Sequence, residues 1–390
     1  MTGGKRLRIG FIPLADATAL MIAVDKGFTA QEGLDVELVR EVSWSNVRDK
    51  LNIGLFDAAH LLAPVAIASS LGLGHVKVPI IAAFGLGLNG NAITVSPALH
   101  AAMKDAAEGD LTDPMVSARA LARVVMARRA RGEEPLTFGM TFPYSTHNYH
   151  LRFWMAAGGV DPDQDVRLIV LPPPYMVESL ANNHVDAFCV GAPWNSVAVD
   201  LGIGHILHFV SEIFQRAAEK VLAVRARWAE DNPDVFRKLV HAHGRAADFV
   251  ENPDNRDEVA SLLSAPDRIA VAPEVICRTL DGRLKVSPDG SYRASDRYLL
   301  IGRNGAARPD PVQAAWLYAQ MVRWGQALMS AEALAEAKAT FRPDLYDEIL
   351  GPQQDLPPSE PADRVGAFTG PAFDPDNIAA HLDGWKIRRR

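Results

Sequence analysis

The chain has 390 residues, of which 48% are hydrophobic and 22% charged, a composition that argues against wholesale disorder and allows two or three domains. Its formal net charge of −7 argues against a protein that coats nucleic acid, and we expect no direct nucleic-acid partner. No uncharged apolar run approaches the ~20 residues that a membrane span needs, so we also expect no membrane segment.

The first 96 residues alternate between short apolar runs and helix-like patterns, as in an α/β unit. Ser43 stands where a helix begins, since its hydroxyl can accept hydrogen bonds from the free N–H groups of a first turn. The expected elements are strands over residues 7–14, 36–42, 58–62 and 79–88, a further apolar segment over 92–96, and helices from Asp16 to about Gly27, over 44–53 and from Pro64.

The middle of the chain reads as a crossover followed by a second α/β unit. Residues 97–134 are more charged and predict helices, and the second unit starts at Leu136. The chain then returns to the first unit from about residue 211. The elements expected there are a strand over 221–224, an amphipathic helix over 233–250, a long ordered loop over 281–311 and a helix over 314–329.

One stretch occurs twice. Asp57-Ala58 stands seven residues before Pro64, and Asp186-Ala187 stands seven residues before Pro193. Each copy predicts a turn, a short buried strand and a helix that begins at proline. The flanks repeat with the same spacing, because Gly10 and Gly139 are 129 residues apart, as are Asp57 and Asp186, and segments 35–39 and 165–169 are 130 apart. A constant offset across three motifs predicts two similar lobes.

We therefore predict an α/β fold with two lobes and a ligand cleft between them. The first lobe is expected to comprise residues 1–96 and 211–390, and the second lobe, with the crossover, residues 97–210. Open α/β sheets bind ligands at the loops that follow the carboxyl ends of their strands. Two facing lobes would bring both sets of loops to one cleft, as in a clamshell binding protein.

Six segments, taken together, resemble the nitrate/bicarbonate binding proteins of ABC transporters. They are residues 7–14 (LRIGFIPL), 41–50 (EVSWSNVRDK), 88–95 (LNGNAITV), 156–162 (AAGGVDP), 172–177 (PPPYMV) and 186–195 (DAFCVGAPWN). The match runs in order along nearly the whole chain. It implies the type II fold of the periplasmic binding proteins and a small oxyanion as ligand.

The N-terminus favours one branch of that family. Arg8 interrupts the first apolar run and Asp16 ends it, so residues 1–16 lack the pattern of a signal peptide. We therefore expect a cytoplasmic protein, similar to the nitrate/nitrite sensors of the NasS type. The resemblance implies that such a sensor holds an RNA-binding antiterminator of the NasT type, releases it when nitrate or nitrite binds, and so regulates nitrate assimilation. The alternative is the substrate-binding component of a nitrate, nitrite or bicarbonate ABC transporter.

A small oxyanion needs several convergent N–H or O–H donors, and helix N-termini provide them. Two helix starts, at Ser43-Trp44 and at residues 144–147 with His147, are candidates. Thr141 ends the first strand of the second lobe, and Gly191, which has no side chain, would allow the backbone to approach the ligand closely. The resemblance further implies that Trp44 packs on the ligand and that Asn89 lies where these binding proteins carry a side-chain amide. The candidate ligand-binding residues are Ser43, Trp44, Asn89, Thr141, His147, Gly191 and Trp194.

Each of these residues also has a purely structural interpretation. Trp44 and Trp194 can be core aromatics, Asn89-Gly90 a plain turn, and His147 a helix-start residue. Two positions depart from the transport relatives, which by resemblance carry a His and a Lys where this chain has Met140 and Gln215. We therefore expect a less basic site, a neutral cage of donors, and the preference among nitrate, nitrite and bicarbonate stays open.

We expect no enzyme, no cofactor and no metal. His184, Asp186 and Cys189 are close in sequence, but their spacing does not place a base beside a nucleophile. The chain contains no phosphate-binding glycine loop and no zinc motif. Its two cysteines lie in apolar runs typical of buried free thiols. Finally, the Arg-rich segment 278–308 is either a surface for an acidic partner or a solvated loop that clasps the first lobe.

Overall fold

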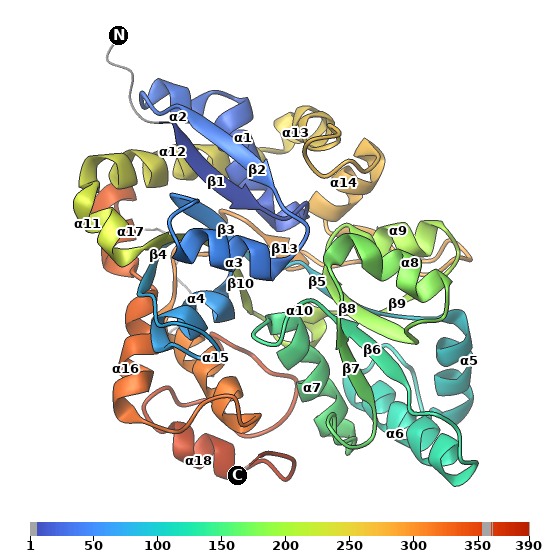
Figure 1. Ribbon diagram of the computed structural model, residues 1–390. Coiled ribbons are helices and arrows are strands. Elements are labelled where there is room, and N and C mark those ends of the chain that lie inside the picture. The colour runs from blue at the N-terminus through green and yellow to red at the C-terminus, as the bar shows by residue number, and fades with distance from the viewer. Residues whose placement is uncertain (1–5, 353–359, 361, 390) are drawn as a thin grey trace.

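The computed structural model describes residues 6–352, 360 and 362–389. The chain forms two mixed sheets side by side, each flanked by helices, and most of the C-terminal helices (orange to red in Figure 1) lie below the first sheet. The first sheet has the strand order β13-β4-β10-β3-β1-β2, and the second has the order β7-β6-β8-β5-β9. Two lobes were therefore correctly predicted.

Apolar strands build the first sheet, with β1 parallel to both β2 and β3 and with β10 antiparallel to β3 and β4. Its strands are β1 (Leu7–Phe11), β2 (Val36–Arg40), β3 (Ala58–Leu62), β4 (Ile80–Asn89), β10 (Ala218–Arg225) and β13 (Leu299–Leu300). The helices of the N-terminal part are η1 (Ala15–Ala17), α1 (Thr18–Asp25), α2 (Phe28–Gln31), α3 (Trp44–Asn52) and α4 (Ala63–Leu71). As predicted, Ser43 is the N-cap of α3 and accepts a hydrogen bond from the Asn46 N–H.

The second sheet is formed by β5 (Asn91–Val95), β6 (Thr137–Met140), β7 (Arg167–Val170), β8 (Ala187–Gly191) and β9 (His205–Phe209). Its helices are α5 (Pro97–Ala106), α6 (Pro114–Ala130), α7 (Thr146–Gly158), η2 (Pro173–Tyr175), α8 (Met176–Ala181), α9 (Trp194–Asp200) and α10 (Val210–Ile213). Helices α5 and α6, predicted as a crossover between the lobes, instead connect β5 to β6 within the second sheet. Helix α7 begins with Ser145 as its N-cap, and its first turn faces the junction of the two sheets.

The later part of the chain adds helices and a hairpin. These elements are α11 (Ala226–Asp231), α12 (Pro233–Glu251), η3 (Pro253–Asn255), α13 (Arg256–Leu263), α14 (Pro273–Leu280), β11 (Arg283–Lys285), β12 (Tyr292–Ala294), α15 (Pro311–Arg323), α16 (Ala331–Thr340), α17 (Pro343–Leu350) and α18 (Ile378–Asp383). The stretch 281–311, expected to be a loop, therefore contains the β11–β12 hairpin and β13. Its Val286 carbonyl accepts a hydrogen bond from Ile206 N–H of the second lobe at 2.9 Å.

The pairing register repeats with the offset seen in the sequence. Asp57 accepts a hydrogen bond from Arg8 N–H at 3.0 Å, and Asp186 accepts one from Thr137 N–H at 2.8 Å. Both bonds link residues 49 positions apart. Strand β1 pairs with β3 at Ile9 to Ala58, and β6 pairs with β8 at the positions 129 residues further on. The repeat is therefore a structural one.

The predicted boundary after residue 96 is wrong. Strand β5 pairs with β8 and β9 in the second sheet, so the chain leaves the first lobe near Gly90. Asn89 and Gly90 both have positive φ, 61° and 80°, which turns the chain from β4 into the other sheet within two residues. The sequence pattern of two adjacent apolar runs did not reveal this change of sheet.

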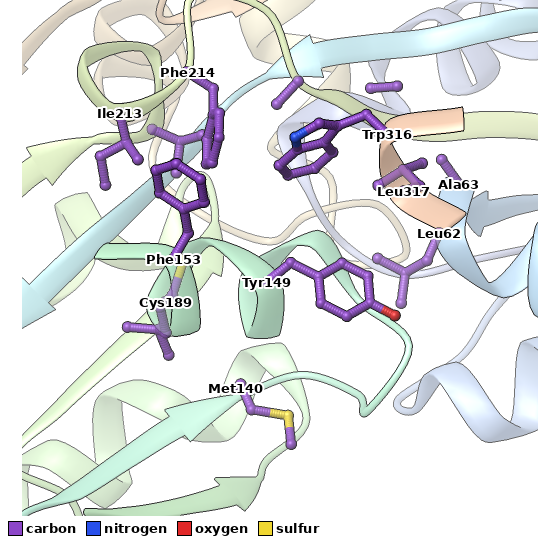
Figure 2. Close-up of a cluster of buried hydrophobic side chains, with 14 of the residues drawn as sticks. Leu62, Ala63, Met140, Tyr149, Phe153, Cys189, Ile213, Phe214, Trp316 and Leu317 are labelled. Carbon is purple, nitrogen blue, oxygen red and sulfur yellow. The ribbon is translucent and has the colours of Figure 1, made fainter. Parts of the chain in front are cut away.

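Aromatic side chains pack between helix α7 of the second lobe and the C-terminal helices. Figure 2 shows Phe153 from α7 against Phe214, with Trp316 from α15 on the other side. The ring centroids of Phe153 and Phe214 are 4.7 Å apart, and those of Phe214 and Trp316 are 4.8 Å apart, both in edge-to-face geometry. Helix α7 is thereby held against the C-terminal helices, and its N-terminus is fixed at the junction of the sheets.

Candidate functional site

A cluster of buried polar side chains lies where the two sheets meet. The first lobe supplies Asp16 from η1, His60 from β3, and Glu219 and Lys220 from β10, and the second lobe supplies Asn91 from β5, Thr146 and His147 from α7, and Thr141 after β6. All eight are at most 3% exposed. Burying so many polar groups is costly unless they are paired or bind a ligand.

Lys220 is the cation at the centre of this cluster. Its Nζ lies 2.7 Å from Asp16 Oδ2, 2.6 Å from Glu219 Oε1 and 5.3 Å from the centroid of the Trp44 ring. Burial lowers the pKa of Lys220, but the two carboxylates outweigh burial and the net pKa is raised. Burial conversely raises the pKa of Asp16, and Lys220 and His60 bring it well below its usual range. The Asp16–Lys220 pair is therefore ionised.

Glu219 ties the first lobe to the second. Its Oε2 accepts hydrogen bonds from Asn91 Nδ2 at 2.7 Å and from the Thr146 hydroxyl. His147 Nε2 lies 3.4 Å from the other oxygen, Oε1. One carboxylate of β10 thus contacts β5 and the first turn of α7, so the geometry of the cluster depends on residues from both lobes.

The histidines of the cluster are neutral. His60 Nδ1 accepts a hydrogen bond from Ile12 N–H at 3.4 Å and its Nε2 lies 2.9 Å from Asp16 Oδ1, which fixes the proton on Nε2. His147 Nδ1 lies 3.0 Å from the Thr141 hydroxyl. Burial lowers the pKa of His60, lowers that of His147 far below its usual range, and brings that of the neighbouring His150 to about 3.

Six polar atoms near this junction have no hydrogen-bond partner within the part of the chain that the structure describes. They are Trp44 Nε1, Trp194 Nε1, His147 Nε2, Asn91 Oδ1 and the two ring nitrogens of His150. An indole N–H can only donate, and leaving a buried donor unpaired costs about 1–3 kcal/mol. A β-carbon added at Gly191 would lie 3.4 Å from Asn91 Oδ1 and 3.6 Å from Asp16 Oδ2, so the Gly191 backbone lines the same space. The set suits a small ligand with acceptor oxygens.

The predicted site residues fall into two groups. Trp44, Thr141, His147 and Gly191 all lie at the cluster or contact one of its members, as the distances above show. Ser43 is half-buried and caps α3 directly before Trp44, with its Oγ 3.3 Å from Asn46 N. Trp194 is the first residue of α9 and packs against the hydrophobic core of both lobes.

The Asn89 side chain does not belong to the polar cluster. Its Nδ2 donates to the Gln215 and Arg297 carbonyl oxygens at 3.1 and 2.8 Å, and its Oδ1 accepts from Ala217 N–H at 3.0 Å. All hydrogen bonds of the Asn89 side-chain amide named here are thus to backbone groups, at the point where the chain passes from the first sheet to the second. Asn91, two residues further on, supplies the side-chain amide of the cluster instead.

The expectation of a neutral donor cage stays a prediction, although the cluster at the junction of the sheets contains Asp16, Glu219 and Lys220. Gln215, at the position where a lysine was sought, is exposed and donates its backbone N–H to the Gly366 carbonyl at 3.0 Å. Lys220 and Glu219 were missed because the strand was expected only from residue 221. Two adjacent charges at the start of an apolar strand were the available signal, since charged residues inside a central strand are rarely buried without a partner.

Two arrangements that look catalytic are closed to substrate. His184 is exposed whereas Cys189 is fully buried, and burial raises the pKa of that thiol well above its usual value. Ser117 Oγ lies 2.6 Å from His208 Nε2, and His208 Nδ1 lies 3.3 Å from Glu212 Oε2. However, Ser117 and His208 are fully buried, so we assign this chain of hydrogen bonds a structural role.

Acid should destabilise the protein because its buried histidines are neutral. The pKa of His150 is about 3 and that of His243 about 4, against about 6.5 in an unfolded chain. The unfolded state therefore binds more protons as the pH falls below about 6.5, and each of these histidines removes about 2 kcal/mol of stability by pH 5. Urea denaturation at pH 8 and pH 5 measures the loss. The variant His150→Gln should lose about 2 kcal/mol less than the wild type; an equal loss would contradict the assignment.

A two-lobed α/β molecule with a cluster of buried polar side chains between its sheets has the fold of the periplasmic binding proteins, and the solved structures agree. The crystal structure of the periplasmic nitrate-binding protein NrtA from Synechocystis PCC 6803 aligns with a TM-score of 0.87 and 29% identity, over 98% of both chains. The alkanesulfonate-binding protein SsuA from Xanthomonas axonopodis pv. citri aligns with a TM-score of 0.57 and 16% identity, over 85% of this chain and 99% of that one, which supports the fold alone.

The chain belongs to the NMT1-like family, whose model matches residues 3–264. It is 31% identical to the nitrate/nitrite binding protein NrtA of Synechococcus elongatus, over 98% of this chain and 87% of the relative. It is 28% identical to the bicarbonate-binding protein CmpA of the same organism, over 99% of this chain and 87% of the relative. The resemblance to nitrate/bicarbonate binding proteins is thereby confirmed. Among the helices described, none is both long and apolar enough to cross a membrane.

Proposed function

We propose that the protein binds a small oxyanion of the nitrate, nitrite and bicarbonate group in the cleft between its lobes, as the substrate-binding component of an ABC transporter. One observation carries the proposal: a buried ammonium, Lys220, lies 5.3 Å from the centroid of the Trp44 ring at the junction of the lobes, and the indole N–H of that ring has no hydrogen-bond partner among the described residues. Relatives matched over nearly the whole chain are named for nitrate, nitrite and bicarbonate, which supports this class of ligand.

Each residue of the proposed site has a distinct role. Trp44 Nε1 and His147 Nε2 are donors for the anion, and Lys220 supplies the positive charge. The Gly191 backbone forms a wall, and Trp194 contributes a second indole N–H. Ser43 and Thr141 act indirectly, because Ser43 caps the helix that carries Trp44 and Thr141 holds the His147 ring.

The sensor hypothesis stays a prediction. The relatives named above are binding proteins, and the structure aligned over both whole chains is of a periplasmic one, so they support the transporter component better than a cytoplasmic sensor of the NasS type with a NasT-type partner. The Arg-rich segment also offers fewer free donors than expected. Four of its arginines form ion pairs within the chain: Arg278 with Asp200, Arg293 with Glu212, Arg303 with Glu251 and Arg308 with Asp347. Isolation of a complex with a NasT-type protein that dissociates when nitrate or nitrite is added would support the sensor hypothesis.

Anion binding should stabilise the folded protein. A ligand present at about 100 times its dissociation constant adds about 2.7 kcal/mol to the free energy of unfolding. We expect the melting temperature to rise with nitrate, nitrite or bicarbonate, and not with sulfate, which is tetrahedral and doubly charged. Differential scanning calorimetry with each sodium salt at matched ionic strength measures the shift. If none of the three monovalent anions raises the melting temperature at millimolar concentration, the proposed function is wrong.

A further inference from the structure

We propose that the oxyanion enters the cleft together with one proton, which is held by His147. This inference rests on the proposed function. It begins with a count of charges: the cluster contains two buried carboxylates, Asp16 and Glu219, and one buried ammonium, Lys220. With its histidines neutral, the cluster already carries one negative charge in excess. A second anion would add to that charge in a site of low dielectric, where like charges repel strongly.

The carboxylates are poor candidates for the proton. Lys220, Asn91 and Thr146 converge on Glu219, and Lys220 and His60 converge on Asp16. Hydrogen bonds and ion pairs of this kind favour the charged form of a carboxylate. Protonation of either would forfeit its contact with the Lys220 ammonium.

Among the histidines, the geometry favours His147. His60 Nδ1 is an acceptor for the Ile12 N–H, so a proton there would break that bond. The His150 ring packs on Phe214, with ring centroids 5.1 Å apart, and forms no ion pair with a carboxylate among the described residues. His147 Nε2 and both ring nitrogens of His150 lack a hydrogen-bond partner among the described residues, but of these three atoms it is His147 Nε2 that lies within ion-pair distance of a carboxylate, 3.4 Å from Glu219 Oε1. A proton on this ring would restore the charge balance.

Both protonation states of His147 keep its other contact. The Thr141 hydroxyl, 3.0 Å from Nδ1, can donate to or accept from the ring. The titratable groups that face the ring are Glu219 and Lys220 from β10, Asp16 from η1 and His150 from α7. Of these, Lys220 disfavours the imidazolium, and the two carboxylates favour it. An anion beside His147 Nε2 adds the deciding negative charge, so ligand and proton bind cooperatively.

The number of protons taken up per anion tests the proposal. The probe is whichever of nitrate, nitrite and bicarbonate binds most tightly, and all three are monovalent anions near pH 8. Proton uptake is recorded with a pH electrode on mixing in weakly buffered solution, and the dissociation constant is measured by calorimetry across about pH 6.5–8.5. We expect uptake of about one proton per anion bound, and an affinity that falls by up to about tenfold per pH unit as the pH rises.

Two variants locate the proton. In His147→Gln, uptake should fall to zero and the affinity, however weak, should no longer depend on pH. His243→Gln is the matched control, because His243 is also fully buried but bonds the Leu239 carbonyl of its own helix, at 2.7 Å; it should behave as the wild type. Wild-type binding without proton uptake overturns the inference and leaves the proposed function standing. Unchanged uptake in folded His147→Gln overturns the role of His147, and absence of binding by all three anions overturns both proposals.

Discussion

Lys220→Met should abolish anion binding and lower the free energy of unfolding by about 3–5 kcal/mol. The substitution removes the ammonium that contacts two buried carboxylates, Asp16 Oδ2 at 2.7 Å and Glu219 Oε1 at 2.6 Å. An uncompensated buried charge must then be protonated or hydrated, and either costs stability. Denaturation by urea measures the stability, and calorimetry with nitrate, nitrite and bicarbonate measures binding.

A matched set of variants separates charge from packing. Lys238→Met removes an exposed lysine of α12 and should change neither property. The triple variant Asp16→Asn, Glu219→Gln, Lys220→Met keeps the shapes of the side chains but removes all three charges. Since replacing a whole buried ion network is often neutral, it should regain most of the lost stability without regaining anion binding. A fully stable Lys220→Met would contradict ionised carboxylates in the cleft.

Trp44→Phe should weaken anion binding by about tenfold or more, because a hydrogen bond to a charged group contributes about 1.5–3 kcal/mol. Phenylalanine keeps an aromatic ring against His60, whose centroid lies 5.4 Å from that of Trp44, and beside the Lys220 ammonium. It removes only the unpartnered Nε1–H and part of the ring. Trp44→Ala should in addition destabilise the apo protein by about 3–5 kcal/mol, because the residue is 1% exposed and a cavity would remain.

Trp324→Phe is the control for this experiment. Trp324 is 5% exposed and its Nε1 likewise has no partner among the described residues, but it lies on the Arg152 and Arg323 side chains rather than in the cleft. Its substitution should leave anion affinity unchanged. If Trp44→Phe binds as tightly as the wild type while Trp44→Ala is destabilised, then Trp44 is a core residue only.

The sequence by itself determined the repeated architecture. The 129-residue offset between Gly10 and Gly139 and between Asp57 and Asp186 reappears as the pairing register of β1 with β3 and of β6 with β8. The start of α3 after Ser43 was also readable. These features follow from local rules, because hydrophobic period, proline and capping residues act over a few neighbouring positions. The same rules placed Trp44, Thr141, His147 and Gly191 at loops and helix starts facing one cleft.

Only the tertiary structure decided the charges of that cleft. Asp16 and Lys220 are 204 residues apart, and Asn91 and Glu219 are 128 apart. Their meeting depends on β10 inserting between β3 and β4, antiparallel to both, while β5 enters the other sheet. Asn89 and Asn91 are two residues apart, but Asn89 and Gly90 have positive φ and turn the chain between them. As a result, the Asn89 side-chain amide donates to the Gln215 carbonyl, whereas the Asn91 amide donates to Glu219. A contact between distant strands depends on sheet order and register, and local sequence patterns do not encode either.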